Sequence, residues 1–191
     1  LFLTYILIQI FVLNEVVFSS YIIPFLYLTI ILSIPKGKSI LFLMIISFVT
    51  GLTIDIFEGQ LGLHSTSCII IAFLRPKILS ILSNSKTLSN EENIRLNNLG
   101  ALQFLVYSST LIFLHSLILF FIVDFEIGNI FNLIIKTILS TLITLLLIFV
   151  NELYYINKIK SNFKFKDKKK FSNLYITNQE FLIIKKNNKK K

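Results

Sequence analysis

The sequence has few of the residues from which soluble domains and small secreted proteins are built. Only 15% of its 191 residues are charged, whereas an average globular domain has about a quarter. A single cysteine excludes an internal disulfide framework and a metal site made of several thiolates. With 6 glycines and 3 prolines, the chain is neither collagen-like nor of low complexity. What it has in abundance is hydrophobic residues, which make up 54% of the chain.

These hydrophobic residues are gathered into long apolar runs. The runs cover residues 1–13, 16–34, 39–57, 63–79, 99–123 and 130–150. Each of the last five is near the roughly 20 residues that a membrane-spanning helix needs, and runs this continuous satisfy their backbone in lipid as helices. The first run is shorter, and we interpret it as the end of a spanning helix whose beginning is absent from this sequence. We therefore predict an all-α integral membrane protein, a bundle of about six transmembrane helices with short loops.

The connections between these runs alternate in charge. Lysine and arginine occur in residues 35–38, 80–98 and 156–191, whereas the intervening connections contain neither. Because the positive-inside rule assigns such connections to the cytoplasm, we predict a transmembrane domain over residues 1–155 with both termini cytoplasmic. The basic cytoplasmic tail, residues 156–191, is expected to meet anionic lipid headgroups. Nucleic acid is not expected as a partner, because no folded basic domain is present to read it.

Small residues occupy one face of the third run and one face of the fourth. These faces consist of Ser47, Gly51 and Asp55 in the third run, and of Ser65, Cys68, Ala72 and Arg75 in the fourth. Such spacing lets two helices approach closely. Because a tight turn joins the runs, we predict an antiparallel hairpin in which Gly59 and Gly62 supply the unusual backbone angles of the turn. Asp55 then lies near the outer end of the hairpin and Arg75 near the inner end, so the two are not expected to pair.

Asp55 is the first functional candidate, because a carboxylate at membrane depth is costly and is usually retained for a reason. His64 lies just across the turn, and a carboxylate–imidazole contact between them is plausible. Such a pair caps and pins a turn, or it serves as a proton relay or part of a metal site. One His and one Asp make an incomplete metal site, so no metal is predicted.

Arg75 and Pro76 close the fourth run and have two interpretations. An arginine at the cytoplasmic end of a helix obeys the positive-inside rule and meets the negative end of the helix dipole. Pro76 leaves one carbonyl without its amide partner, so we expect the helix to kink or end there. Alternatively, the two residues form a rigid cytoplasmic platform for a partner protein.

Polar residues also form seams in the last two runs. They are Gln103, Tyr107 and Thr110 in the fifth run, and Lys136, Thr137, Ser140, Thr141 and Thr144 in the sixth. Such seams join helices through hydrogen bonds, or they line a ligand cavity. The sequence contains no nucleophile elbow, phosphate-binding loop or zinc signature. We therefore predict a protein that is not an enzyme and uses no cofactor.

Residues 51–76, GLTIDIFEGQLGLHSTSCIIIAFLRP, resemble the core of the rod shape-determining protein family MreD in the form found in Bacteroidetes-like bacteria. The positions that carry the resemblance are Gly51, Leu52, Asp55, Gly62, His64, Leu74, Arg75 and Pro76. Residues 12–35 also look like the entry to the second helix of that family. The resemblance covers about residues 1–82, and nothing is carried over onto the lysine-rich tail, which is longer and more basic than the family pattern.

The resemblance implies a non-enzymatic scaffold in the inner membrane, within the machinery for cell elongation and lateral peptidoglycan synthesis. Its implied partners are an MreC-like bitopic protein, an MreB-like actin homologue, and the glycan polymerase and transpeptidase of wall elongation. Two other hypotheses remain open. One is a six-helix solute-binding subunit of a vitamin-type transporter, and the other is a lipid-modifying or lipid-flipping enzyme that uses Asp55 and His64.

Overall fold

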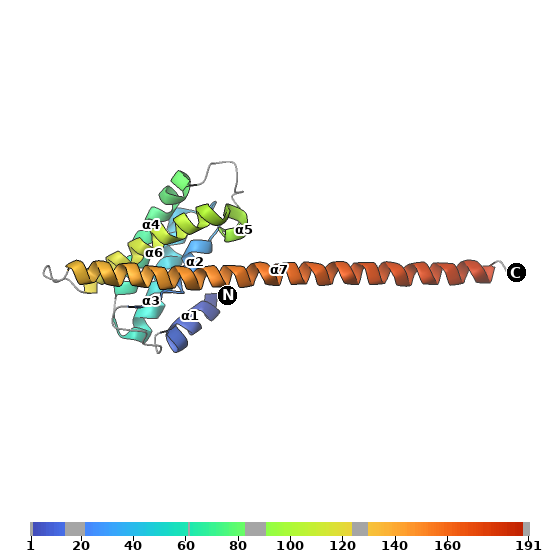
Figure 1. Cartoon of the computed structure of the whole chain (residues 1–191), viewed down its shortest axis with the longest axis horizontal. Coiled ribbons are helices and arrows are strands. Elements are labelled where there is room, and N and C mark those ends of the chain that lie inside the picture. Colours follow the sequence, from blue (N-terminus) through green and yellow to red (C-terminus); the bar gives the residue numbers. More distant parts are fainter. Residues whose placement is uncertain (1, 14–21, 61, 83–90, 124–129, 189–191) are drawn as a thin grey trace. The chain divides into compact units, whose positions relative to one another are not determined.

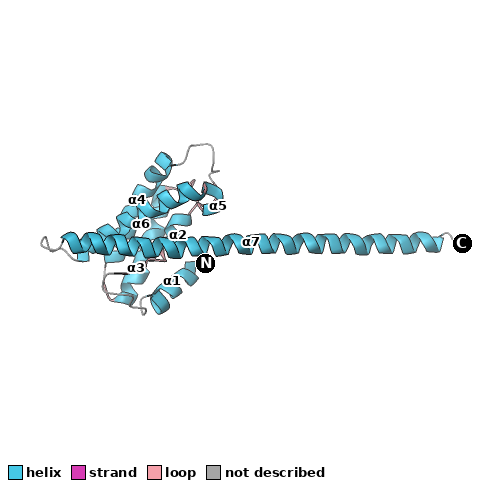
Figure 2. Cartoon of the chain, viewed as in Figure 1, coloured by secondary structure: helices cyan, strands magenta, loops and turns pink. Residues whose placement is uncertain are grey.

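The computed structural model is helical throughout its regular elements (Figure 1; Figure 2). It describes residues 2–13, 22–60, 62–82, 91–123 and 130–188. The helices are α1 (Phe2–Ile8), the π-helix η1 (Gln9–Leu13), α2 (Leu28–Ser33), α3 (Ile40–Glu58), α4 (Leu63–Leu82), α5 (Leu96–Leu99), α6 (Ala101–Val123) and α7 (Ile130–Asn188). The chain divides into two compact units, Leu1–Val150 and Asn151–Lys191. The predicted all-α class is confirmed over the residues described.

Four of the described helices are long and apolar enough to cross a membrane. They cover Ile40–Glu58, Leu63–Leu82, Ala101–Val123 and Ile130–Ile159. A shorter apolar helix covers Leu3–Leu13. These four agree with the last four predicted runs and identify the chain as a multi-pass membrane protein by length and composition.

The second predicted run is not one helix. Residues 22–27, which we call the entry segment, are extended and then turn, and α2 begins only at Leu28. Pro24 lies in this non-helical part, where its missing N–H removes no helical hydrogen bond. The side chains of Phe25 and Tyr27 are fully buried. The prediction of a helix over residues 16–34 is therefore wrong for residues 22–27, and residues 16–21 lie outside the described part of the chain.

The amide of Gln9, in η1, binds the backbone of the entry segment on two sides. Its Nε2 donates to the carbonyl oxygen of Pro24 at 2.8 Å, and its Oε1 accepts from the N–H of Leu26 at 2.8 Å. Non-helical backbone at membrane depth is tolerated where protein groups satisfy it. Gln9 is itself buried, so its side-chain amide, and not solvent water, satisfies these two backbone groups.

Two hydroxyl groups on α7 satisfy further N–H groups of the entry segment. Ser140 Oγ accepts from the N–H of Ile23 at 3.0 Å, and Thr144 Oγ1 accepts from the N–H of Phe25 at 3.0 Å. The two acceptors are one helical turn apart, and the two donors are two residues apart in extended backbone. Both spacings are close to 6 Å, which is why a helix face can bind alternate residues of an extended segment.

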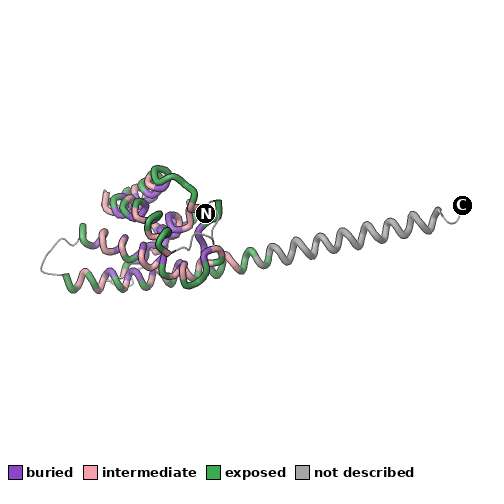
Figure 3. The backbone as a smooth tube through the Cα atoms, turned by 90° about the horizontal axis from the view of Figure 1, so that it is seen from above, coloured by how far each residue is buried: buried purple, intermediate pink, exposed green. Residues whose placement is uncertain are grey.

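The small-residue hairpin predicted for α3 and α4 is confirmed. A Cβ atom placed on Gly51 would lie 2.4 Å from Cα of Ser65, so the two helices touch backbone to backbone at this point. Ser47, Asp55 and Cys68 are buried along the same contact. α4 packs against α6 as well as α3, which puts it at the centre of its unit. Figure 3 shows how buried and exposed residues alternate along these helices.

The end of α4 differs from the prediction. The helix continues through Pro76 to Leu82 instead of ending near the proline. Pro76 removes only the hydrogen bond to the carbonyl one turn earlier, and its ring lies on the exposed side of the helix. Leu79 is buried, and this contact holds the final turns in place.

The last helix is also longer than the sixth apolar run. α7 extends to Asn188, so most of the basic tail is helical. The predicted division at residue 155 falls inside this helix, and the compact-unit division falls at Val150.

Candidate functional site

Asp55 is fully buried and caps the amino-terminal end of α4. Its Oδ1 accepts from the N–H of His64 at 2.8 Å, and its Oδ2 accepts from the N–H groups of Gly62 at 3.2 Å and Ser65 at 2.9 Å. The first N–H groups of a helix lack partners within the helix and carry its positive dipole end. These three backbone N–H groups therefore stabilise the buried carboxylate of Asp55. The predicted contact between Asp55 and His64 is made through the backbone of His64, not its imidazole.

The turn between α3 and α4 depends on two glycines in left-handed conformation. Gly59 has φ 69° and ends α3, where its N–H donates to the carbonyl of Asp55. Gly62 has φ 96° and precedes α4. Residues with a Cβ rarely adopt such angles, so both positions confirm the prediction of unusual backbone angles in this turn.

Arg75 is buried and caps the carboxyl-terminal end of α2. Its Nη2 donates to the carbonyl oxygens of Leu32, at 3.3 Å, and of Ile34. Its Nε donates to the hydroxyl of Tyr107 at 2.7 Å, and that hydroxyl donates to the carbonyl of Leu32 at 3.1 Å. Arg75 thus meets the negative end of a helix dipole, as one interpretation expects, but the helix is α2 instead of α4.

The burial of Arg75 also limits the platform hypothesis. Its side chain is 1% exposed, so the guanidinium is not a surface group for a partner. Pro76 is exposed on the same helix. Asp55 and Arg75 bind different backbone groups at different sites, in agreement with the prediction that they do not pair.

A third buried site joins four ionisable side chains by short contacts. The hydroxyl of Tyr27 lies 2.7 Å from Nδ1 of His64 and 3.0 Å from Nε2 of His115. The Nε2 of His64 lies 2.8 Å from Oε2 of Glu58. We call these four residues the relay cluster. They come from the entry segment, α4, α6 and α3, so the cluster ties four separate elements together.

The walls of the relay cluster are aromatic and apolar. The ring of Phe25 lies edge-on to the rings of Tyr27 and His115, with centroid separations of 6.2 and 5.0 Å. The Sγ of Cys68 lies 3.9 Å from Nε2 of His115. Among the described residues, no group of three His, Cys, Asp or Glu side chains could hold a metal ion.

Sequence reasoning found only part of this cluster. His64 is one of the predicted site residues, whereas the sequence patterns do not connect Tyr27, Glu58 or His115 with it. One signal was present in the sequence: the chain has only 2 histidines, and both lie in apolar runs. Their contact through Tyr27 depends on the packing of α4 against α6, which spacing along the chain does not reveal.

The hydroxyl groups of the polar seams in α6 and α7 form hydrogen bonds within the protein. Tyr107 binds Arg75, and Ser140 and Thr144 bind the entry segment. Other seam hydroxyls donate to carbonyls one turn earlier in their own helix, as Thr141 does to Thr137 at 2.6 Å. These bonds favour the interpretation in which the seams join helices.

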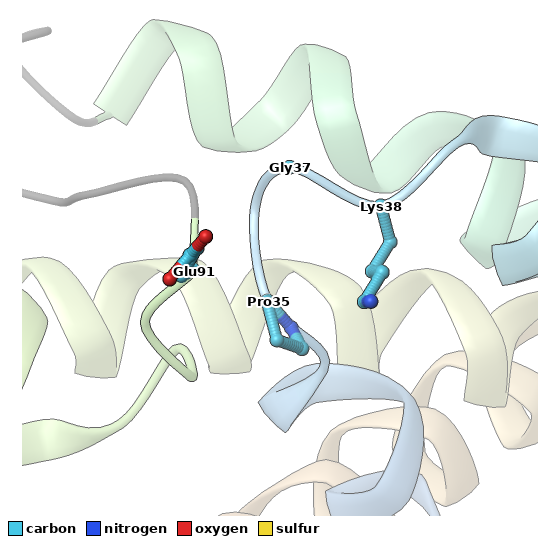
Figure 4. A pocket seen from close by; sticks show the side chains of 4 residues that line it. All are labelled: Pro35, Gly37, Lys38 and Glu91. Carbon is cyan, nitrogen blue, oxygen red and sulfur yellow. The ribbon is translucent and has the colours of Figure 1, made fainter.

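A pocket of about 500 Å³ begins next to the Arg75 site, because its lining residue Pro35 directly follows Ile34, whose carbonyl accepts from Arg75. Figure 4 shows its lining: Pro35, Gly37 and Lys38 from the connection between α2 and α3, and Glu91 from the connection before α5. The Nζ of Lys38 also lies 5.7 Å from the ring centroid of Phe42. The pocket therefore offers one group of each charge and no seam hydroxyl.

Comparison with known proteins adds no relative to this description. No family model, no curated protein and no solved structure matches the chain.

Proposed function

We propose that the chain is a non-enzymatic scaffold subunit of the bacterial machinery for cell elongation and lateral peptidoglycan synthesis. This proposal is supported by the contacts of Asp55 and Arg75, the two fully buried charged residues of the family-like hairpin. Each is buried and bound to backbone groups at the end of a helix. Such residues determine the shape of the bundle, and a shape held by internal caps is what a scaffold offers to its partners.

The surface of the bundle supports the same proposal. Large apolar side chains such as Ile45, Phe48 and Ile56 on α3 are exposed. In a membrane, such faces meet lipid or the helices of other membrane proteins. We propose that an MreC-like bitopic protein contacts these faces, and that an MreB-like actin homologue, the glycan polymerase and the transpeptidase belong to the same assembly.

The topology that we propose has six crossings of the inner membrane, with both termini in the cytoplasm. Its second crossing is discontinuous, because residues 22–27 are not helical. Extended residues advance roughly twice as far per residue as helical ones, so a short extended segment followed by a short helix covers much of the bilayer. The basic tail then meets anionic headgroups on the cytoplasmic side.

The scaffold proposal can be tested with two separate alanine variants near the end of α4. One replaces a buried cation, and the other replaces an exposed cation. Arg75→Ala removes the cap of α2, whereas Lys77→Ala removes an exposed charge two residues later. We expect Arg75→Ala, at equal membrane level, to reduce co-purification with an MreC-like partner and to round the cells. Lys77→Ala should keep both properties. Normal capture and normal rods with Arg75→Ala would count against the proposal.

The two other hypotheses draw less support. A solute-binding subunit would need free seam groups, but Ser140 and Thr144 bind the entry segment. A lipid-modifying enzyme would need an accessible Asp55, but both of its carboxylate oxygens accept backbone hydrogen bonds. A thermal-shift screen with vitamins and lipid-linked precursors addresses both, since a strong specific shift would favour one of them over the scaffold.

A further inference from the structure

The side chains of the relay cluster take no part in the caps that support the scaffold proposal, although the backbone N–H of His64 donates to Asp55. It runs from Glu58, whose side chain is 22% exposed at the α3–α4 turn, to His115, which is fully buried on α6. Three contacts of 2.7 to 3.0 Å connect its four members. Buried ionisable groups in a membrane bundle are costly, so a continuous chain of them needs an explanation.

The hydroxyl of Tyr27 is the centre of the explanation. It lies between two imidazole nitrogens, yet a phenol has one proton to donate. Tyr27 must therefore donate to one histidine and accept from the other. This restriction leaves two directions of hydrogen bonding around Tyr27 for the same positions of the heavy atoms.

In the first pattern, both imidazoles are neutral. Tyr27 donates to Nδ1 of His64, and the Nε2–H of His115 donates to the Tyr27 oxygen. The Nε2–H of His64 donates to the carboxylate of Glu58. The Nδ1 of His115 is then a bare acceptor.

In the second pattern, the direction of the bonds around Tyr27 is reversed. The Nδ1–H of His64 donates to the Tyr27 oxygen, and Tyr27 donates to Nε2 of His115. His64 still donates from Nε2 to Glu58 and is therefore an imidazolium paired with a carboxylate at 2.8 Å. His115 now carries its proton on Nδ1.

We propose that the relay cluster is a proton-binding site whose two states are these two patterns. They differ by one proton, and the change balances. The added proton bonds to Nδ1 of His115, the Nε2 proton of His115 moves to the Tyr27 oxygen, and the former Tyr27 hydroxyl proton moves to Nδ1 of His64. The added proton comes from a hydronium ion of the solvent. Counting the O–H bond of that ion, three bonds to hydrogen form and three break, and the positive charge ends on His64.

The surroundings decide where the added charge rests. Glu58 lies against His64, and the carboxylate of Asp55 lies one turn earlier on α3, with its oxygens on the first N–H groups of α4. Both negative charges favour the imidazolium at His64 over one at His115. Cys68 and Tyr27 are the other titratable groups beside His115, and α7 faces the entry segment with two hydroxyl groups.

Proton uptake would change the hydrogen-bonding role of Nδ1 of His115, a residue far from Glu58 in the sequence. The Nδ1 of His115 has no hydrogen-bond partner among the described residues, and the residue is fully buried. It changes from an acceptor to a donor between the two patterns. Protonation of His64 on α4 is thereby coupled to the position of the proton on His115 of α6, and this inference does not rest on the proposed scaffold function.

The experiment uses the full chain in lipid nanodiscs with ¹⁵N-labelled histidine. Because the chain has only 2 histidines, His64→Asn and His115→Asn variants assign every signal. We expect the nitrogen signals of both residues to change between about pH 8 and 5 with one shared midpoint, and the protonated nitrogen of His115 to switch from Nε2 to Nδ1. Signals of His115 that stay constant, or two separate midpoints, would overturn the proposal.

Tyr27→Phe tests the coupling, and Tyr107→Phe is the matched control, since Tyr107 is an equally buried tyrosine in the Arg75 site. We expect Tyr27→Phe to leave a titration at His64 and abolish the response of His115, whereas Tyr107→Phe keeps both. A His115 response that survives Tyr27→Phe refutes the relay. If Tyr27→Phe does not fold, Glu58→Gln decides: the shared midpoint should move when the carboxylate is removed, and an unchanged midpoint overturns the proposal.

Discussion

Replacing Gly51 by alanine tests the close approach of α3 and α4. The new Cβ would lie 2.4 Å from Cα and 2.5 Å from N of Ser65, whereas carbon atoms in contact are normally about 3.5–4.0 Å apart. The helices must therefore separate by on the order of 1 Å at this point. Overpacking of this kind costs about 1–3 kcal/mol, and the better helix propensity of alanine returns less than about 1 kcal/mol.

The separation would also strain the cap made by Asp55, which lies one turn further along α3. Its bonds to the N–H groups of His64 and Ser65 are 2.8 and 2.9 Å long and lengthen when the helices move apart. A charge-assisted hydrogen bond is worth about 1.5–3 kcal/mol. We therefore expect Gly51→Ala to lower the free energy of unfolding by about 1–2 kcal/mol, the overpacking cost less the propensity gain, and by more if the cap made by Asp55 weakens.

The assay is reversible unfolding of the purified chain in mixed micelles, followed by helical circular dichroism. Thr53→Ala is the matched control, because Thr53 lies within one turn of Gly51 and bonds to the carbonyl of Val49 in its own helix. We expect Thr53→Ala to stay within about 0.5 kcal/mol of the wild type. Equal stabilities of the two variants would refute the reasoning.

A double variant sharpens this test. The clash of Gly51→Ala is with backbone atoms of Ser65, so removing the serine side chain with Ser65→Gly cannot relieve it. Rescue of Gly51→Ala by Ser65→Gly would show that side-chain crowding, instead of backbone contact, limits the hairpin.

The remaining predictions concern the caps and the turn, measured by the same unfolding assay, and the entry segment, measured by amide hydrogen exchange. Asp55→Asn should cost about 1–3 kcal/mol, because the amide cannot accept all three N–H groups as a carboxylate does; wild-type stability would contradict the cap. Arg75→Lys should cost about 1–2 kcal/mol although the charge is kept, because an ammonium lacks the planar fork. Gly62→Ala should cost about 1 kcal/mol through its positive φ. Gln9→Leu should speed amide hydrogen exchange at Leu26, and unchanged exchange would show that Gln9 does not hold the entry segment.

The hairpin was predictable from the sequence because its signals are local. Ser47, Gly51 and Asp55 share one helix face through their spacing alone, and the turn glycines follow directly after the helix. The partners of Asp55 are 7 to 10 residues away along the chain. Short connections of this kind leave few alternatives for how two helices can pack.

The entry segment was mispredicted because hydropathy does not distinguish a spanning helix from buried extended backbone. Both are continuously apolar, and they differ only in which groups are the hydrogen-bond partners of the backbone. Here two of these partners are the hydroxyl groups of Ser140 and Thr144, which lie 117 and 119 residues after the N–H groups that they accept from. No local pattern in residues 22–27 contains this information.

The amino-acid sequence by itself determined that the chain is a membrane protein, that its long apolar runs form helices, and that α3 and α4 pack along small residues. These outcomes follow from burial and from neighbours a few positions apart. Only the tertiary structure decided which backbone ends Arg75 caps and which side chains surround Tyr27. Those contacts join α2, α4 and α6, and a hydrogen bond between distant segments depends on angles and distances that exist only after the helices have packed.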